Sequence, residues 1–250
     1  MAVWVVGDPH LSLGGDKPMD VFGPNCERHQ ERLADNWRAL VGEEDCVIVA
    51  GDVSWALRIE DAVPDLRFLD SLPGKRKILL RGNHDYWWTT RRKVTLLLEE
   101  NQLTTLQIFQ NEAILLEEAA LPLLMVGTRG WKLPFDEDFS AEDRKVYLRE
   151  VERLRLSLKA AADLRQSDGE GGTQGNRIEL VAVLHYPPVS RDGRGSELSD
   201  LLEAACVKAC YYGHVHGYAG RQSFRGERNG IEYFNIACDQ IDCTPQKIAE

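Results

Sequence analysis

Five short polar segments follow directly on apolar, strand-like runs, and they constrain the fold more than any other feature of the sequence. Each segment carries side chains that can bind a metal ion, and glycine precedes the first of them in four of the five. When such runs form parallel strands joined by helices, their carboxyl ends meet at one edge of the sheet, so the segments converge on one cleft. The segments are Gly7-Asp8-Pro9-His10, Gly51-Asp52, Gly82-Asn83-His84-Asp85, Leu184-His185 and Gly213-His214-Val215-His216.

The distribution of histidine supports a metal centre at this cleft. Five of the six histidines lie in the five segments, and only His29 lies elsewhere, in a helical stretch where we expect an ordinary, satisfied imidazole. Imidazole nitrogens and carboxylate oxygens together bind divalent ions, and the lack of thiolate in the set argues against a structural zinc site. Glycine suits these positions because the chain turns sharply off the strand and its backbone passes close to the ion. The pattern therefore indicates a catalytic metal centre.

The N-terminal half alternates strand-like runs with helical patterns, which implies crossover connections and a largely parallel sheet. A polar loop over residues 12–25 precedes the first helix, and Pro64 interrupts the second helical stretch. The expected strands are 3–6, 46–50 and 77–80, and the expected helices are 27–40, 58–72 and about 87–100.

The C-terminal half is richer in adjacent strands and contains one long charged helix. We expect this helix from about residue 141 to 164, and a mobile loop over 166–172, where the chain is too polar to bury an apolar surface. Two packed sheets with helices on the outside satisfy both halves of the pattern. The expected strands are 106–109, 113–116, 123–126, 178–184, 209–212, 218–223 and 232–236.

Size and composition fit one domain that spans residues 1–250. A chain of 250 residues, 43 % of them hydrophobic, can bury roughly 70–75 % of its unfolded surface, enough for a rigid core around an active site. Neither an internal repeat nor a linker divides the sequence. We expect the six cysteines to be buried free thiols, because disulfide frameworks belong to small secreted chains, although Cys238 and Cys243 could form an incidental thiol pair.

Neither a targeting segment nor a membrane span is expected. The first apolar run is only a few residues long and has no basic start, and no later apolar stretch approaches the ~20 residues of a spanning helix. We therefore expect a cytoplasmic protein that does not bind membranes. The formal net charge of −10 also opposes attraction to nucleic acid, so a small molecule is the expected partner. The oligomeric state stays open.

The order, content and spacing of the five segments resemble those of the calcineurin-like metallophosphoesterases. The likeness extends from Asp8 to His216, and a full set of these motifs is highly specific. Neighbouring sequence, such as Asp85-Tyr86-Trp87-Trp88, is similar to that of a bacterial branch of the family described as predicted phosphohydrolases. The resemblance implies an α/β fold, which some schemes class as α+β, in the form of a four-layer αββα sandwich of two mixed sheets flanked by helices.

The same resemblance implies a binuclear metal centre formed by seven side chains. Its two divalent ions, which could be manganese, iron, zinc or nickel, would lie ~3.5–4 Å apart and share a hydroxide that attacks the phosphate ester. His84 is the one motif histidine left without a metal, and its imidazolium would stabilise the transition state or protonate the leaving group. Asp85 either orients His84 or caps the following helix. The implied ligands are Asp8, His10 and His216 for one ion, Asn83, His185 and His214 for the other, and Asp52 as the bridge between them.

The expected activity is hydrolysis of a small-molecule phosphate ester, with a phosphodiester favoured. Protein phosphatases of the superfamily carry the signature GDxVDRG, but Gly51-Asp52 is followed here by Val53-Ser54-Trp55, without the second Asp and the phosphate-clamping Arg. A phosphomonoesterase is the alternative among enzymes, and a non-catalytic scaffold with the same fold is the alternative to an enzyme. Repair nucleases use the same centre but need a basic surface, which an acidic chain does not offer.

Substrate specificity is expected from the loops around the cleft, over residues 12–25, 86–90, 129–135 and 186–194. Trp87 or Trp131 could stack on a base, since indole suits that task, and Arg191 or Arg194 could hold a phosphate. A core or surface role is equally open for each of the four side chains.

Overall fold

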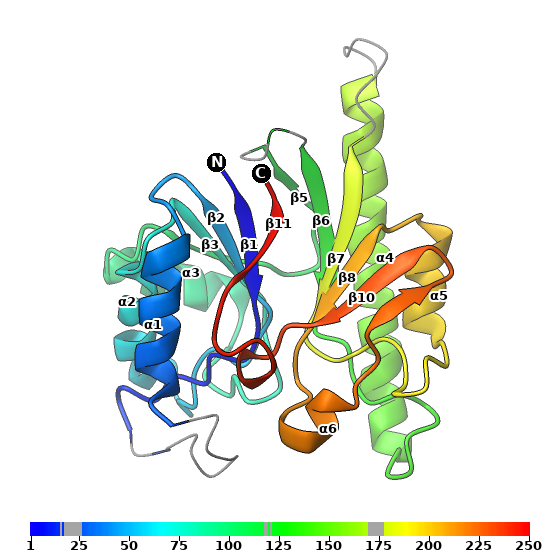
Figure 1. Cartoon of the computed structure of the whole chain (residues 1–250), viewed down its shortest axis with the longest axis horizontal. Helices are drawn as coiled ribbons and strands as arrows, with labels where there is room; N and C mark the ends of the chain where they lie inside the picture. Colours follow the sequence, from blue (N-terminus) through cyan, green and yellow to red (C-terminus); the bar gives the residue numbers. More distant parts are fainter. Residues whose placement is uncertain (16, 18–26, 118–119, 121, 170–177) are drawn as a thin grey trace.

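Two β-sheets pack face to face in the molecule, and helices cover the outer face of each sheet (Figure 1). This computed structural model describes residues 1–15, 17, 27–117, 120, 122–169 and 178–250. Both sheets mix parallel and antiparallel neighbours. The predicted four-layer αββα sandwich of the α/β class is therefore confirmed.

The first sheet is built mainly from the N-terminal half of the chain. Its parallel strands are β1 (Val3–Val6), β2 (Cys46–Val49), β3 (Arg76–Leu79) and β4 (Leu106–Ile108), and β11 (Gln246–Ala249) pairs antiparallel with β1. The strand order is β11-β1-β2-β3-β4. The helices on its outer face, on the left in Figure 1, are α1 (His29–Leu40), α2 (Val63–Asp70) and α3 (Arg91–Glu100).

The second sheet comes from the C-terminal half. Its parallel strands are β6 (Leu123–Thr128), β7 (Glu179–Leu184), β8 (Ala209–Tyr212) and β10 (Ile231–Asn235). Antiparallel edge strands, β5 (Ile114–Leu116) and β9 (Gly226–Arg228), complete the order β5-β6-β7-β8-β10-β9. The long helix α4 (Ala141–Gly169) and the short α5 (Glu197–Ala204) cover its outer face, on the right in Figure 1.

Strand β1 shows how the sequence produces these layers. Successive side chains of a strand point to opposite faces, and both faces of this sheet are covered. Val3 and Val5 therefore pack in the core between the two sheets, together with Val181 of β7. Trp4 and Val6 pack in the other direction, in the core beneath the helices of the first sheet. Burial on both faces explains why this strand reads as a continuous apolar run.

Most of the predicted strands are present, but the one predicted over residues 218–223 is wrong. That segment forms a short helix, α6 (Gly217–Arg221), which begins where Gly217 turns the chain with a φ of 58°. Two edge strands, β9 and β11, were not predicted, because their residues are largely exposed and give no apolar run. Helix α5 was also missed, although Ser196 caps its first turn.

The ends of several predicted helices need correction. Pro64 does not interrupt a helix but lies in the first turn of α2, where a missing N–H costs no hydrogen bond. Helix α3 begins at Arg91 rather than near residue 87, because Thr90 is its cap and accepts a hydrogen bond from the Lys93 N–H. Helix α4 continues to Gly169, so the loop predicted over 166–172 is wrong up to that residue. The rest of that loop, and most of the loop predicted over 12–25, lie outside the described residues.

The cysteines outside position 26 are free thiols, as predicted. Cys46, Cys210, Cys238 and Cys243 are buried, whereas Cys206 is exposed, contrary to the prediction of burial. Cys26 lies outside the described residues. In the described part of the chain, no helix has both the length and the apolar character that a bilayer crossing requires.

Candidate metal centre

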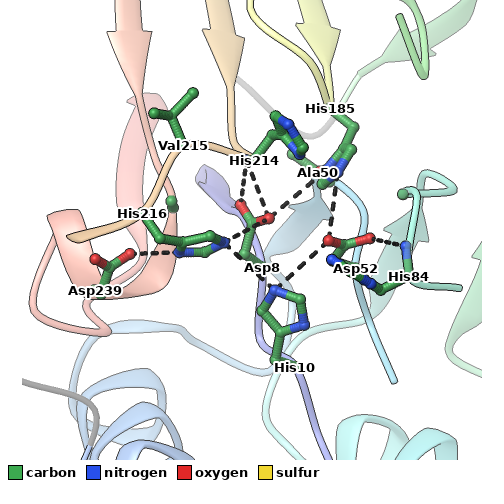
Figure 2. Close-up of polar contacts among 12 residues, drawn as sticks. Asp8, His10, Ala50, Asp52, His84, His185, His214, Val215, His216 and Asp239 are labelled. Atoms are coloured by element: carbon green, nitrogen blue, oxygen red, sulfur yellow. Dashed lines mark hydrogen bonds and ion pairs between the residues drawn. The ribbon is translucent and has the colours of Figure 1, made fainter. Parts of the chain in front are cut away.

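Side chains that follow β1, β2, β3, β7 and β8 meet in one cluster (Figure 2). Its histidines and carboxylates form two groups, and within each group the possible ligand atoms all lie within 4.8 Å of one another. The groups combine residues far apart in sequence, as parallel strands with a common edge predict. One group is Asp8, His10 and His216, and the other is Asp52, His185 and His214.

Asp52 belongs to the second group and also faces the first. Its Oδ2 atom is 3.5 Å from Nε2 of His10 in one group and 3.4 Å from Nε2 of His185 in the other. Asn83, the one predicted ligand that is neither acid nor histidine, places its Oδ1 atom 2.7 Å from the same His185 nitrogen. The structure thus brings together all seven side chains that the sequence analysis selected.

Four residues of the cluster have a backbone conformation that side chains other than glycine rarely adopt. The φ angles are 55° at Asp8, 44° at His10, 51° at Asp52 and 70° at His214. Such conformations cost of order 1–3 kcal/mol each, persist only where the surroundings enforce them, and gather at functional sites. Backbone hydrogen bonds enforce two of them, from the Asp8 N–H to Gly51 at 3.1 Å and from the His10 N–H to Asp52 at 2.9 Å.

The glycines of the motifs are required for close approach. A Cβ atom on Gly82 would lie 2.0 Å from Oδ1 of Asp52, and one on Gly213 would lie 2.0 Å from Oδ2 of Asp8. Real Cβ atoms do not come so close to another heavy atom, so any side chain at these positions would displace a carboxylate. Glycine was predicted to let the backbone pass close to the centre. In the structure, Gly82 and Gly213 let the backbone pass close to the carboxylates of Asp52 and Asp8.

Burial and mutual repulsion shift the protonation of the cluster. Burial raises the pKa of Asp52 to about 8, and the nearby Asp8 carboxylate adds to the rise. Burial also lowers the pKa of His10 and His214 well below 6.5, helped by the surrounding histidines. For His216 burial alone would lower the pKa, but Asp8 and Asp239 outweigh it and raise it to about 10. The neutral histidines therefore leave the negative charge of the buried carboxylates only partly balanced.

The donor set fits divalent cations. Asp8 and Asp52 are buried, so two neighbouring carboxylates have lost their contact with water. The Nε2 atoms of His10 and His216 face each other at 3.4 Å, which two neutral nitrogens tolerate only with a shared proton or a cation between them. Bound cations would balance the carboxylates and take up these imidazole lone pairs.

Asp239, which the sequence analysis did not select, holds His216 in place. Its Oδ1 atom is 2.7 Å from Nδ1 of His216, and its Oδ2 atom accepts the Gly217 N–H at 2.8 Å (Figure 2). A carboxylate on the second ring nitrogen fixes the ring and makes the first nitrogen a better ligand. The available signal was the position of Asp239 shortly after a strand, β10, which is where the other site residues lie.

Aromatic rings flank the cluster on two sides. Trp55 stacks on His10 with centroids 4.6 Å apart and lies 4.5 Å from the ring of His84. Tyr186 lies against His214 at 3.7 Å. His84 belongs to neither metal-type group, but its backbone N–H donates to Oδ1 of Asp52 at 2.7 Å. His84 therefore lies beside the centre with its half-buried ring free of the ligand groups.

Asp85 performs neither of the two roles considered for it. Its buried carboxylate accepts hydrogen bonds from the N–H groups of Val53, Ser54 and Gly82 and from Nε1 of Trp87, at 2.7 to 3.1 Å. Among the described residues it forms no hydrogen bond or ion pair with the His84 ring, and the cap of α3 is Thr90. Asp85 instead ties together the loops after β2 and β3, which carry Asp52 and Asn83.

Of the side chains considered for substrate contact, Trp131 lies close to the cluster, with its ring centroid 5.1 Å from that of Tyr186, which lies against His214. Trp87 is completely buried, so its proposed stacking on a base is wrong. Trp131 is half-buried, donates to Asp143 at 2.8 Å, and packs beneath Arg129. Arg191 and Arg194 are exposed outside the cluster. His29 is buried with Nε2 3.1 Å from the carbonyl of Pro9, a satisfied imidazole as predicted.

A family model described as calcineurin-like phosphoesterase matches residues 1–218. This region contains all seven side chains of the cluster and His84, so the family resemblance predicted from the motifs is confirmed.

Solved structures with a similar fold have low sequence identity. A phosphopantetheinyl hydrolase (PptH) from Mycobacterium tuberculosis superposes with a TM-score of 0.51 at 15 % identity, over 99 % of this chain and 95 % of that one. The protein TT1561 of Thermus thermophilus gives a TM-score of 0.53 at 10 % identity, over 99 % and 97 % of the two chains. At such identities the likeness supports the fold alone.

A curated relative matches only in part. The gene 66 protein of Mycobacterium phage L5 is 30 % identical over 84 residues. That alignment covers 33 % of this chain and 39 % of the phage protein.

Metal affinity should rise with pH. At neutral pH both Asp52, with a pKa of about 8, and His216, with a pKa of about 10, hold protons that a cation must displace. We expect Mn²⁺ to bind more tightly between pH 6 and 8, by roughly tenfold per pH unit for each proton released. Calorimetric titration in two buffers with different ionisation enthalpies measures both affinity and proton release. An affinity that does not depend on pH would contradict this assignment.

Replacing Asp239 by Asn should weaken metal binding. The neutral amide holds His216 less firmly, and loss of such a partner costs roughly 10- to 100-fold in metal affinity. Titration with Mn²⁺ measures the change, and circular dichroism checks the fold. The matched control is Asp35→Asn on α1, whose side chain is 79 % exposed, and it should bind as the parent does. Equal affinities for the two variants would count against a supporting role for Asp239.

Proposed function

The chain belongs to the calcineurin-like phosphoesterase family, and from this membership we propose that it hydrolyses small phosphate esters with two divalent metal ions. One observation supports two ions in particular, namely that Asp52 belongs to one group of ligand atoms and also faces the other. A carboxylate with a histidine of each group within 3.5 Å is suited to bridge two cations. The proposed ligands are Asp8, His10 and His216 for one ion, Asn83, His185 and His214 for the other, and Asp52 for both.

Two bound cations would polarise the phosphoryl oxygens and lower the pKa of water to near neutrality. The protein supplies the positioning. Strand ends fix the ligand side chains, and the strained backbone at Asp8 and His10 is held by hydrogen bonds between the two loops. Manganese, iron, zinc and nickel all suit a set of nitrogen and oxygen ligands, and the ion that is used depends on its availability.

His84 is proposed as the catalytic residue that does not bind a metal. Its ring lies 5.6 Å from that of His10, and its N–H bond to Asp52 fixes its backbone beside the centre. A half-buried imidazole at this place can donate a proton to the leaving oxygen or hydrogen-bond the phosphoryl group. Burial lowers the pKa of His84, so the negative charge of a nearby substrate phosphate would be needed to favour its charged form.

A phosphodiester is the favoured substrate, and a phosphomonoester is the alternative. Beyond Gly51-Asp52, where protein phosphatases have charged residues, Trp55 packs against His10 and His84. An aromatic wall at this position suits the second organic substituent of a diester better than the extra charge of a monoester. A non-catalytic scaffold remains the alternative to an enzyme, and no ester turnover in a metal-loaded preparation would favour it.

Three further features of the proposal come from the sequence. We propose that the chain forms one domain over residues 1–250 and that it acts in the cytoplasm. We also propose that its partner is a small molecule rather than nucleic acid, since the net charge of −10 repels polyanions.

The direct test compares a chromogenic diester, bis-p-nitrophenyl phosphate, with the matched monoester p-nitrophenyl phosphate. Protein loaded with Mn²⁺ should hydrolyse the diester faster than the monoester, and treatment with a chelator should abolish turnover until Mn²⁺ is restored. Faster hydrolysis of the monoester than of the diester would favour a phosphomonoester as the substrate.

Replacing Asp52 by Asn should impair both metal sites. The amide keeps the size of the side chain but removes the negative charge that faces both groups, so the bound metal per chain should fall for both ions. Elemental analysis after gel filtration measures the metal, and the same preparation should hydrolyse the diester poorly. Asp61→Asn, at an exposed position, is the control and should retain the metal content of the parent. Retention of both ions by Asp52→Asn would contradict the bridging role.

Replacing His84 by Ala should separate catalysis from metal binding. Loss of a general acid lowers turnover by ~10²-fold or more. Both ions should stay bound, because His84 contributes to neither ligand group. Steady-state rates and metal content measured on one preparation give both results. Thr89→Ala, an exposed neighbour, should leave the rate and the metal content as they are. Loss of metal from His84→Ala would make it a ligand instead.

A further inference from the structure

A second polar pocket lies near the metal centre and contains three arginine side chains. Arg81, Arg129 and Arg153 line it together with the carboxylate of Glu150, and its cavity volume is about 40 Å³. We call it the arginine pocket. With three positive charges and one negative charge, it differs from the rest of this acidic protein.

Glu150 is already fully occupied by partners. The carboxylate, 1 % exposed, accepts from Oγ1 of Thr128 at 2.5 Å, from Nη2 of Arg129 at 3.1 Å and from Nη1 of Arg153 at 2.6 Å. It therefore balances one guanidinium and holds two of them in place. Among the lining residues, the arginine pocket keeps an excess of two positive charges that Glu150 does not neutralise. The Asp85 carboxylate also acts on Arg81, but four N–H groups already occupy it.

Arg81 carries much of this excess. Its Nε atom is buried without a hydrogen-bond acceptor, and no hydrogen bond or ion pair of its side chain occurs within the described residues. The Nε atom of Arg129 is also buried and unpaired. Buried donors without acceptors are costly, and a guanidinium that stabilises a fold normally has a carboxylate or carbonyl partner. Arg81 thus has a free hydrogen-bond donor that an anion from outside the protein could occupy.

The arginine pocket adjoins the metal centre through the backbone. Arg81 precedes Asn83 by two residues, so their Cα atoms are at most about 7 Å apart. The Arg129 carbonyl accepts N–H bonds from His185 at 3.2 Å and from Tyr186 at 2.8 Å. The walls of the arginine pocket are therefore continuous with the loops that carry two of the seven cluster residues.

We propose that the arginine pocket binds a second phosphate group of the substrate, so that the preferred esters carry a phosphate in addition to the one that is cut. Phosphate fits for two reasons. Its charge of about −1.5 to −2 at neutral pH matches the excess of two positive charges, and guanidinium forks bind phosphate oxygens in pairs. This inference rests on the proposed phosphoesterase function and names the substrate class of the same site.

A thermal experiment separates a binding role of Arg81 from a structural one. Full-length protein loaded with Mn²⁺ is melted in sodium sulfate, whose tetrahedral dianion mimics phosphate, and in sodium chloride of equal ionic strength. The expected result is a higher melting temperature in sulfate for the parent, and a smaller sulfate effect for Arg81→Gln. In chloride, Arg81→Gln should melt no lower than the parent, because it removes a buried unpaired charge. A lower melting temperature in chloride, or an unchanged sulfate effect, would overturn the proposal.

A kinetic experiment tests the substrate class. The two probes are thymidine 5′-(p-nitrophenyl phosphate) and the same diester with a 3′-phosphate. The parent should have the lower KM for the phosphorylated ester, and Arg81→Gln should raise that KM about 10- to 100-fold, the value of a hydrogen bond to a charged group. The rise should be much smaller for the ester without the 3′-phosphate.

The matched control is Arg92→Gln, an exposed arginine on α3, which should leave the ratio of the two KM values as it is. Equal rises in both KM values for Arg81→Gln, or none, would refute the arginine pocket as a phosphate subsite. Failure to hydrolyse either ester would instead contradict the proposed function, and the sulfate comparison would still decide whether Arg81 binds an anion.

Discussion

Two carboxylates buried next to each other, Asp8 and Asp52, are the constraint on which the rest of the centre depends. Neither is exposed to water, and their repulsion adds to the burial that raises the pKa of Asp52. The surrounding imidazoles offer little compensation, because burial keeps most of them neutral. A cation is the simplest species that balances such a site. With cations bound, the net charge of −10 of the whole chain would not prevent a phosphate from binding, because the charge close to the site has the larger effect.

The fold allows two carboxylates to be buried side by side. Much of this fold could be predicted from the sequence. β1 and β2 lie side by side in the middle of their sheet with both faces covered, so their ends are rigid enough to hold strained residues. Burial on both faces also makes these strands continuous apolar runs, which is why they were visible in the sequence. Edge strands such as β9 and β11 are stabilised by pairing rather than by their own apolar residues, so no local pattern marked them.

The candidate site divides in the same way. Side chains directly after buried strands could be predicted, because the strand gives their position and the residue type gives their chemistry. The histidines that Asp239, Trp55 and Tyr186 contact could not be predicted, since these contacts depend on the path of a loop. Asp85 is the instructive case, for its type and position were clear, but two of its four N–H donors come from the loop after β2, which is distant in sequence. The residue type determines what such a side chain can do but not which neighbours reach it.

The wide spacing of the cluster along the chain has a consequence for biosynthesis. Asp8 lies near the start of the described chain, whereas His214 and His216 follow β8 in the second sheet. At usual translation rates, the β8 segment leaves the ribosome roughly 10 to 40 seconds after Asp8 does. During that interval the nascent chain carries Asp8 and Asp52 without His214 and His216, the last members of the two groups. Binding of a metal ion by the complete set of candidate ligands would therefore have to follow the synthesis of β8.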